Sequence, residues 1–197
     1  MKKIILASKS KARVNILTNS GIKFEAIGSN VDETKIKQKC LIEKLDSKVT
    51  SLKLAQAKAL EISKKYDNHL VIGADQILEC DNILFSKAEN INEAKEVLKF
   101  LRNKTHYLVN GVTIAINNEI VWNYNSKIKM AMRNFSDNFL DNYVENNPEI
   151  INSVGCYFLE GEGIQLFSEI ESDYFGILGL PIIPILDFLR NKEVVLK

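Results

Sequence analysis

The carboxylate of Asp75 is the first group in this sequence that could do chemistry. It follows a short apolar run at residues 70–74, which only Gly73 interrupts. Such a run is typical of a strand covered on both faces, and the ends of these strands face the ligand crevice in open α/β sheets. A dry, unpaired charge is costly there, so Asp75 would need water, a cation or a metal ion. The alternative is that Asp75 only begins a turn.

A second group of polar residues follows the first predicted strand, at residues 3–7. A short helix that begins at Ser8 or Ser10 and stops at Gly21 would place Arg13 in its first turn. Backbone N–H groups, two hydroxyls and a guanidinium at the positive end of a helix can bind an anion. The glycines of a P-loop are missing. The alternative is ordinary capping with a solvated Arg13.

Three further charged residues lie on other predicted elements. Lys58 lies near the apolar face of a helix expected over residues 52–65, where a lysine either extends to water or reaches into a cleft. Glu33 follows a short second strand, in an acidic segment that would ordinarily be a solvated turn. Lys87 comes directly after a predicted hairpin formed by residues 77–80 and 83–85.

The remaining predicted elements alternate between strand and helix, which places the chain in the α/β class with a mixed sheet. A hairpin around Asn117-Asn118 joins two long strands, and residues 35–48 form either a helix or a mobile segment. The other predictions are strands at 24–27, 105–116, 120–132, 153–158 and 161–167, and helices at 92–101, 136–146 and 182–189.

Composition restricts the possible partners. The 197 residues, 46% of them apolar, can form one domain with a sizeable core, with room for two lobes. A net charge of +1 argues against nucleic acid or a membrane surface as a partner, and no stretch is long enough to cross a bilayer. The three cysteines, Cys40, Cys80 and Cys156, lack paired spacings and are expected to be buried thiols in a reducing compartment.

Several motifs, in order along nearly the whole chain, give it a resemblance to the Maf family of nucleoside triphosphate pyrophosphatases. They are Leu6-Ala-Ser-Lys-Ser-Lys-Ala-Arg13, Val31-Asp-Glu33, Ala57-Lys-Ala59, Ile72-Gly-Ala-Asp-Gln76, Ser86-Lys87, Val154-Gly-Cys-Tyr157, Glu160-Gly161 and Ile177-Leu-Gly-Leu-Pro181. The resemblance implies a single domain over residues 1–197, with an elongated mixed sheet, flanking helices and two lobes around a central cleft. It also implies a cytoplasmic homodimer.

The activity that the resemblance implies is metal-dependent hydrolysis of a nucleoside triphosphate between its α and β phosphates. Asp75 and Glu33 would hold magnesium or manganese, since both offer hard oxygen ligands, and Asp75 would also orient the attacking water. Lys58 and Lys87 would complete the catalytic set. The substrate would be bound by Ser8, Ser10, Arg13, Gln76 and Glu160.

Two of these residues indicate a base preference within the family. Gln76 and Glu160 stand where the group that prefers uridine and thymidine triphosphates usually has Thr and Gln, so the sequence favours 7-methyl-GTP. A carboxylate at position 160 could accept hydrogen bonds from the N1–H and amino group of guanine. A preference for dTTP or UTP is the alternative.

The chain departs from the usual family motifs at a few positions. Lys11 and Ala12 replace a proline and an arginine of the first motif, Ala88 replaces a proline after Lys87, and Asn110 stands where a threonine is typical. With these changes, the alternative is that the protein is a nucleotide-binding regulator of cell division with little turnover.

Overall fold

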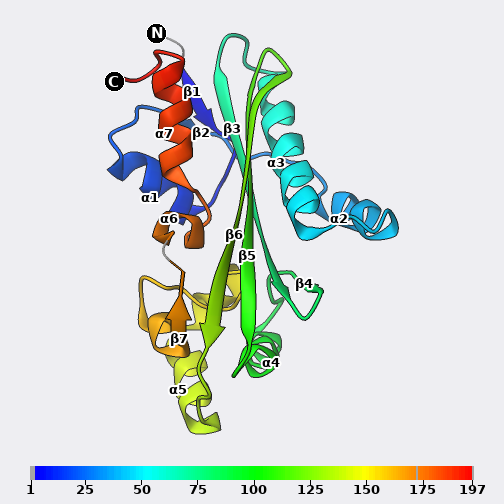
Figure 1. Cartoon of the computed structure of the whole chain (residues 1–197), viewed down its shortest axis with the longest axis vertical. Coiled ribbons are helices and arrows are strands. Elements are labelled where there is room, and N and C mark those ends of the chain that lie inside the picture. The colour runs from blue at the N-terminus through cyan, green and yellow to red at the C-terminus, as the bar shows by residue number, and fades with distance from the viewer. Residues whose placement is uncertain (1–2, 172, 197) are drawn as a thin grey trace. The chain divides into compact units, whose positions relative to one another are not determined.

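In the computed structural model, which describes residues 3–171 and 173–196, seven strands form a mixed sheet (Figure 1). Their order is β2-β1-β3-β5-β6-β7, and β4 pairs with β3 outside this path. β1 runs parallel to both β2 and β3, whereas β4 and β7 run antiparallel to β3 and β6. The strands are β1 (Ile4–Leu6), β2 (Glu25–Ala26), β3 (Leu70–Cys80), β4 (Ile83–Phe85), β5 (Thr105–Ile116), β6 (Glu119–Met132) and β7 (Phe167–Ile170).

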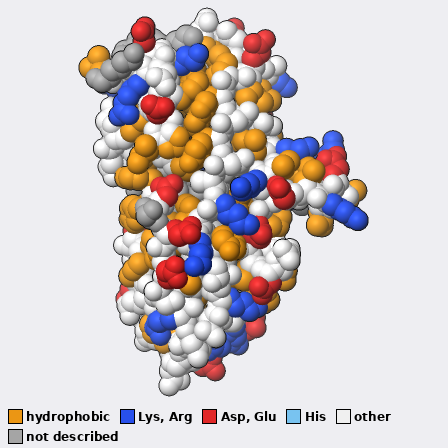
Figure 2. Space-filling model, viewed as in Figure 1, with side chains coloured by type: hydrophobic (Ala, Val, Ile, Leu, Met, Phe, Trp, Pro, Cys, Tyr) orange, Lys and Arg blue, Asp and Glu red, His pale blue; other side chains and the backbone are white. Residues whose placement is uncertain are grey.

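Seven α-helices and two short 3₁₀ helices complete the described part of the chain. The α-helices are α1 (Lys11–Asn19), α2 (Glu33–Ile42), α3 (Ser47–Ser63), α4 (Ile91–Leu101), α5 (Asp137–Asn146), α6 (Tyr174–Ile177) and α7 (Ile182–Asn191); the 3₁₀ helices are Pro148–Asn152 and Glu162–Leu166. None of these helices has both the length and the apolar character that a membrane crossing requires. On the face shown in Figure 2, basic and acidic side chains are interspersed, in agreement with the net charge of +1.

The chain forms two compact units. The first comprises the described residues of Met1–Gln76, Asn110–Ser126 and Asp173–Lys197, and the second those of Ile77–Val109 and Lys127–Ser172. Because β3, β5 and β6 each contribute to both units, three of the passages between the units lie within strands.

Alternation along the strands of the first unit builds a core on each face of its sheet. Ile4 and Leu6 of β1 pack with the apolar faces of α1 and α7, while Ile5 between them packs with Ala59 and Ile62 of α3. Successive strand side chains point to opposite faces, so a three-residue strand serves both cores. Figure 1 shows the same arrangement, with α1 and α7 on one side of β1 and β3 and α3 on the other.

Two glycines on the adjacent strands β3 and β5 let α3 lie unusually close to the sheet. A Cβ at Gly73 would fall 2.2 Å from the carbonyl oxygen of Ala55 and 2.7 Å from the amide nitrogen of Ala59. A Cβ at Gly111 would fall 2.4 Å from the carbonyl oxygen of Ser51. These partners recur every four residues along one face of α3, so the helix backbone itself contacts the sheet.

The second unit has its own core. Leu98 of α4 and Leu140 of α5 are fully buried, and these two helices pack together. His106 of β5 is also fully buried, and its Nε2 lies 2.8 Å from the hydroxyl of Tyr157. Among the described residues, His106 Nδ1 is a buried polar atom without a hydrogen-bond partner. Burial lowers the pKa of His106 to about 4, so the imidazole is neutral in the folded protein at neutral pH.

Several sequence predictions are confirmed and others are wrong. The strand at 105–116 has the predicted bounds, and the helix that Ser136 caps begins one residue after it. The strand predicted at 153–158 is absent, because Cys156 has φ +57°, which no extended strand allows. A 3₁₀ helix replaces most of the strand predicted at 161–167, and β7 begins only at Phe167.

The other differences concern helix starts and the length of β3. The segment 35–48 holds most of α2, which begins two residues earlier at Glu33. Helix α3 begins at Ser47, and Asp46 caps it by accepting a hydrogen bond from the amide of Val49. The prediction that β3 stops at Asp75 is wrong, since the strand continues to Cys80 and pairs there with β4.

Substituting Gly73 tests the close packing of α3. Gly73→Ala would place a methyl group against backbone atoms that cannot rotate away, so we expect a loss of about 1–3 kcal/mol in the free energy of unfolding. Urea unfolding followed by circular dichroism measures it. Gly161→Ala is the matched control, because its Cβ would meet only the Phe158 carbonyl at 3.8 Å. Equal stability of the two variants would contradict the packing argument.

The buried His106 should make stability depend on pH. Its folded pKa of about 4 lies below the unfolded value of about 6.5, so the unfolded chain binds the extra proton as the pH falls between these values. We expect this residue to cost about 2 kcal/mol of stability between about pH 7.5 and about pH 5. His106→Gln should remove that part of the pH dependence, whereas His69→Gln should leave it. An unchanged slope in His106→Gln would argue against the neutral buried imidazole.

Candidate functional site

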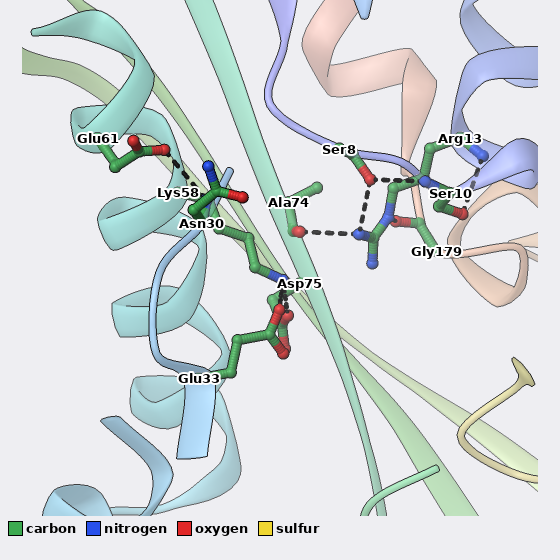
Figure 3. A network of polar contacts seen from close by, with 10 residues as sticks. All are labelled: Ser8, Ser10, Arg13, Asn30, Glu33, Lys58, Glu61, Ala74, Asp75 and Gly179. Atoms are coloured by element: carbon green, nitrogen blue, oxygen red, sulfur yellow. Dashed lines mark hydrogen bonds and ion pairs between the residues drawn. The ribbon is translucent and has the colours of Figure 1, made fainter. Parts of the chain in front are cut away.

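The ammonium group of Lys58 lies between two carboxylates in the first unit (Figure 3). Its Nζ is 2.6 Å from Asp75 Oδ1 and 2.8 Å from Glu33 Oε1. Lys58 is 7% exposed and Asp75 6%, while the side chain of Glu33 remains 46% exposed. A buried ion pair with a second, partly hydrated carboxylate therefore forms the centre of the site.

The packing of α3 on β3 explains why Lys58 reaches Asp75. Gly73 and Asp75 are two residues apart on β3 and so point to the same face of the sheet, toward α3. Gly73 contacts Ala55 and Ala59, and Lys58 lies between these two residues on the same helix. The close approach permitted by Gly73 thus brings the Lys58 ammonium group to the carboxylate one step further along the strand.

Glu33 is positioned by the start of α2. Asp32 caps this helix by accepting a hydrogen bond from the amide of Lys35 at 3.0 Å, so Glu33 is its first residue. Burial of Glu33 opposes its ionisation, but the hydrogen bond and charge of Lys58 outweigh that effect, and the pKa of Glu33 lies below its ordinary value. Upstream of the cap, the amide of Asn30 donates to Glu61 Oε2 of α3 at 3.3 Å, which ties the preceding loop to that helix.

Arg13 lies beyond the carboxyl end of β1. The amide of Ala7 donates to the carbonyl of Ile72, and the next carbonyl on that edge of β3, at Ala74, accepts from Arg13 Nη1 at 2.9 Å. Arg13 Nε donates to the carbonyl of Gly179 at 2.8 Å. The guanidinium is planar, so fixing two of its nitrogens also fixes the direction of the third.

The start of α1 supplies hydroxyls around the same group. Ser10 caps the helix by accepting from the amide of Arg13, and Ser8 Oγ accepts from Arg13 Nη1 at 3.4 Å. Loss of hydration lowers the pKa of Arg13 more than the charges of Asp75 and Glu33 raise it. The acceptors bonded to the guanidinium here are neutral, so its charge can attract an anion at the N-terminus of α1.

The structure therefore brings together six of the residues singled out in the sequence, contributed by three helices, β3 and the segment after β1: Ser8, Ser10, Arg13, Glu33, Lys58 and Asp75. The sequence predicted that a strand ends at Asp75, but Asp75 lies within β3. The strand that ends at this site is β1, just before Ser8. Lys87 and Glu160 belong to the second unit, and their part in the site stays a prediction.

Gln76 has protein partners in this structure. Its amide nitrogen lies 2.9 Å from the carbonyl of Gly176, 3.0 Å from that of Ile177 and 3.2 Å from Asn110 Oδ1. In the sequence, Asn110 is only a departure from a motif, and Gly179 is only one residue of the motif Ile177-Leu-Gly-Leu-Pro181. Neither position carried a local signal for its contact, because each contact joins segments far apart in the chain.

The carboxylates could also serve a divalent cation. Within residues 3–171 and 173–196, no group of three or more His, Cys, Asp or Glu side chains gathers in a way that could hold a metal ion. Asp75 and Glu33 do bring two carboxylates to one point, since both contact Lys58 Nζ. Magnesium is commonly held by one or two carboxylates together with phosphate oxygens of a substrate. The pair fits that kind of site rather than an all-protein cage.

Fold and site together define a mixed α/β protein with a buried lysine between two carboxylates and an arginine at a helix N-terminus. The family model described as Maf-like protein matches residues 3–192. The chain therefore belongs to the Maf family.

Curated relatives match over nearly their whole length. A protein of Granulibacter bethesdensis, 42% identical over 98% of both chains, is named nucleoside triphosphate pyrophosphatase. One of Caulobacter vibrioides, 45% identical over 95% of this chain and 94% of its own, has the same name. A relative from Rhizobium meliloti, 39% identical over 98% of this chain and 97% of its own, is named 7-methyl-GTP pyrophosphatase.

Removing the central ammonium group should destabilise the fold. Lys58→Met leaves the buried Asp75 carboxylate without its cation, so we expect the free energy of unfolding to fall by about 3–5 kcal/mol. Adding Asp75→Asn should restore much of this loss, because the uncompensated charge is then gone. Chemical denaturation of the single and double variants measures both effects.

Lys65→Met is the matched control for this substitution. Lys65, just after the end of α3, pairs with Glu61 of that helix, but its side chain is largely exposed, so we expect a loss of less than about 1 kcal/mol. If Lys58→Met were no more destabilising than Lys65→Met, the Lys58–Asp75 pair would not be a stabilising contact.

Proposed function

We propose that this protein is a nucleoside triphosphate pyrophosphatase. It hydrolyses the bond between the α and β phosphates and releases a nucleoside monophosphate and pyrophosphate. The observation that carries the proposal is the Lys58 ammonium group held by Asp75 and Glu33, next to Arg13 at the start of α1. Membership of the Maf family and the names of the full-length relatives support the same reaction.

The electrostatics of the site suit a polyphosphate. A triphosphate is a polyanion, and catalysis of its cleavage rests mainly on positioning and on stabilising developing charge. Arg13 and the backbone N–H groups at the start of α1 bind phosphate oxygens. Ser8 and Ser10 orient this end of the helix through their hydrogen bonds.

Asp75 acts on the attacking water. Its carboxylate orients the water toward the α-phosphorus and accepts a proton as the new P–O bond forms and the bond to pyrophosphate breaks. The contact with Lys58 holds the carboxylate in one orientation. Asp75 and Glu33 would hold magnesium or manganese, which when bound neutralises phosphate charge in the transition state.

The family resemblance suggests roles for two residues of the second unit, Lys87 and Glu160. Lys87 supplies a further cation for the phosphates, and Glu160 reads the base. A carboxylate suits the N1–H and amino group of guanine, which favours 7-methyl-GTP, the substrate named for the relative from Rhizobium meliloti. From the same resemblance we expect a cytoplasmic homodimer.

A panel of triphosphates tests the reaction. With magnesium present, we expect the protein to release pyrophosphate, and not inorganic phosphate, with a higher kcat/KM for 7-methyl-GTP than for UTP or dTTP. Removing divalent cations with EDTA should abolish turnover. Asp75→Asn and Glu33→Gln should each lower kcat at least about 100-fold, since each removes a charge that acts in the transition state. Coupled pyrophosphate detection and chromatography of the monophosphate measure the products.

Glu25→Gln, an exposed substitution on β2, is the control and should retain full turnover. Near-normal hydrolysis by both Asp75→Asn and Glu33→Gln would remove the proposed site. Faster cleavage of UTP than of 7-methyl-GTP would reverse the base preference. Tight nucleotide binding without product would instead favour the regulator that Lys11 and Ala12 leave open.

A further inference from the structure

We propose that Asn110 is a positioning residue that holds Arg13 in its phosphate-binding orientation, acting through Gln76 and the turn that ends α6. The inference rests on the proposed function and extends it to a residue that touches neither the phosphates nor the base. All the groups involved lie in the first unit, and their contacts form one continuous chain from β5 to Arg13.

The chain begins at a buried amide. Asn110 is fully buried, and its Nδ2 donates to the carbonyl of Gly176 at 3.0 Å and to Ser126 Oγ at 3.1 Å. Its Oδ1 accepts from Gln76 Nε2 at 3.2 Å. Gln76 also donates to the carbonyls of Gly176 and Ile177, so two amide side chains from neighbouring strands hold the last turn of α6.

α6 needs this support because it is too short to be stable alone. It has four residues, and a single turn gains little from its own hydrogen bonds. Asp173 caps its start by accepting from the amide of Gly176 at 2.9 Å. At its other end, the amides of Gln76 and Asn110 donate to the carbonyls of Gly176 and Ile177, which supports the end of the helix.

The turn after α6 carries the effect to Arg13. The amide of Gly179 donates to the carbonyl of Gly176 and that of Leu180 to the carbonyl of Phe175, each at 3.0 Å, as in a Schellman motif. Gly179 has φ +90°, a conformation that favours glycine. This geometry directs its carbonyl to Arg13 Nε at 2.8 Å. The carbonyl of Gly176 therefore accepts from Asn110 Nδ2 and also from the amide of Gly179, the residue whose own carbonyl contacts Arg13.

An asparagine suits position 110 because its side chain both donates and accepts hydrogen bonds. One side-chain amide provides a further acceptor for Gln76 Nε2, which shares its two hydrogens among three oxygens, and the donors that Gly176 and Ser126 accept. A leucine of similar size would fill the space but leave the Gln76 amide and the Gly176 carbonyl without these bonds. The turn would then lose one of the bonds that fix the Gly179 carbonyl, and the contact of that carbonyl with Arg13 Nε would be held less firmly.

A double-mutant cycle tests the inference. We expect Asn110→Leu to lower kcat/KM for 7-methyl-GTP by about tenfold, and Arg13→Ala by about 100-fold or more. In the Arg13→Ala background, Asn110→Leu should cost less than about twofold, because the group that it positions is gone. A tenfold loss in both backgrounds would mean that Asn110 acts independently of Arg13 and would overturn the proposal.

A matched control separates positioning from general destabilisation. Asn147 of the second unit also donates its amide to a helix carbonyl, that of Tyr143 at 2.9 Å. Asn147→Leu should lower stability to a similar degree and leave kcat/KM unchanged. Should both variants lose the same fraction of activity, the role of Asn110 would be structural only. Asn110→Ser, which shortens the polar group, enters the same cycle if Asn110→Leu does not fold.

Binding of a methylene analogue distinguishes this inference from the proposed function. The dissociation constant of the α,β-methylene analogue of 7-methyl-GTP, measured by calorimetry, reports the contribution of Arg13 to binding without any bond cleavage. If the native protein binds the analogue but releases no pyrophosphate from any triphosphate, the proposed function fails, and the cycle is measured in dissociation constants. Additive effects of the two substitutions on binding would overturn the positioning role, as would a native protein that does not bind the analogue.

Discussion

The burial of one ammonium group between two carboxylates is the interaction on which the site depends. Moving charged groups out of water costs several kcal/mol each, and good geometry is needed to offset this cost. Lys58 meets this requirement with contacts of 2.6 Å and 2.8 Å to Asp75 and Glu33. Glu33 keeps nearly half of its side chain in water, which limits the desolvation. The result is a fixed carboxylate on β3 and a second, more accessible one at the start of α2.

This interaction requires the backbone of α3 to contact the sheet. A helix that packs through large side chains lies further from the sheet, and Lys58 would then approach Asp75 from a greater distance. Gly73 and Gly111 remove the side chains that would hold α3 away. The same alternation that directs Gly73 and Asp75 to α3 directs Ala74 and Gln76 to the opposite face. One strand therefore supplies the partners of Lys58 on one face and the contacts to α6 on the other.

Local patterns predicted much of the fold and of the charged cluster, because those parts depend on neighbouring residues. Ser10 and Ser136 cap the predicted helices, and the hairpin around Asn117-Asn118 is present. The predicted hairpin of residues 77–80 and 83–85 is present, but the continuity of β3 through Asp75 and Gln76 was not predictable in this way, since these polar residues are satisfied by α3 and α6, which are distant in sequence. Cys156 is a comparable case: a positive φ at a cysteine depends on surroundings that its own segment does not specify.

The charge balance of the cluster explains why further positive charge is needed. Lys58 and Arg13 are offset by Asp75 and Glu33, so the four groups together are neutral when all are ionised. A polyanion would find local donors there but no net attraction, and the chain as a whole adds only +1. A divalent cation held by the two carboxylates would make the cluster positive. The ion pair with Lys58 then keeps Glu33 ionised and ready to bind a cation, since it lowers the pKa of Glu33. The hydrogen bonds of Arg13 run to neutral oxygens, so its guanidinium can attract an anion.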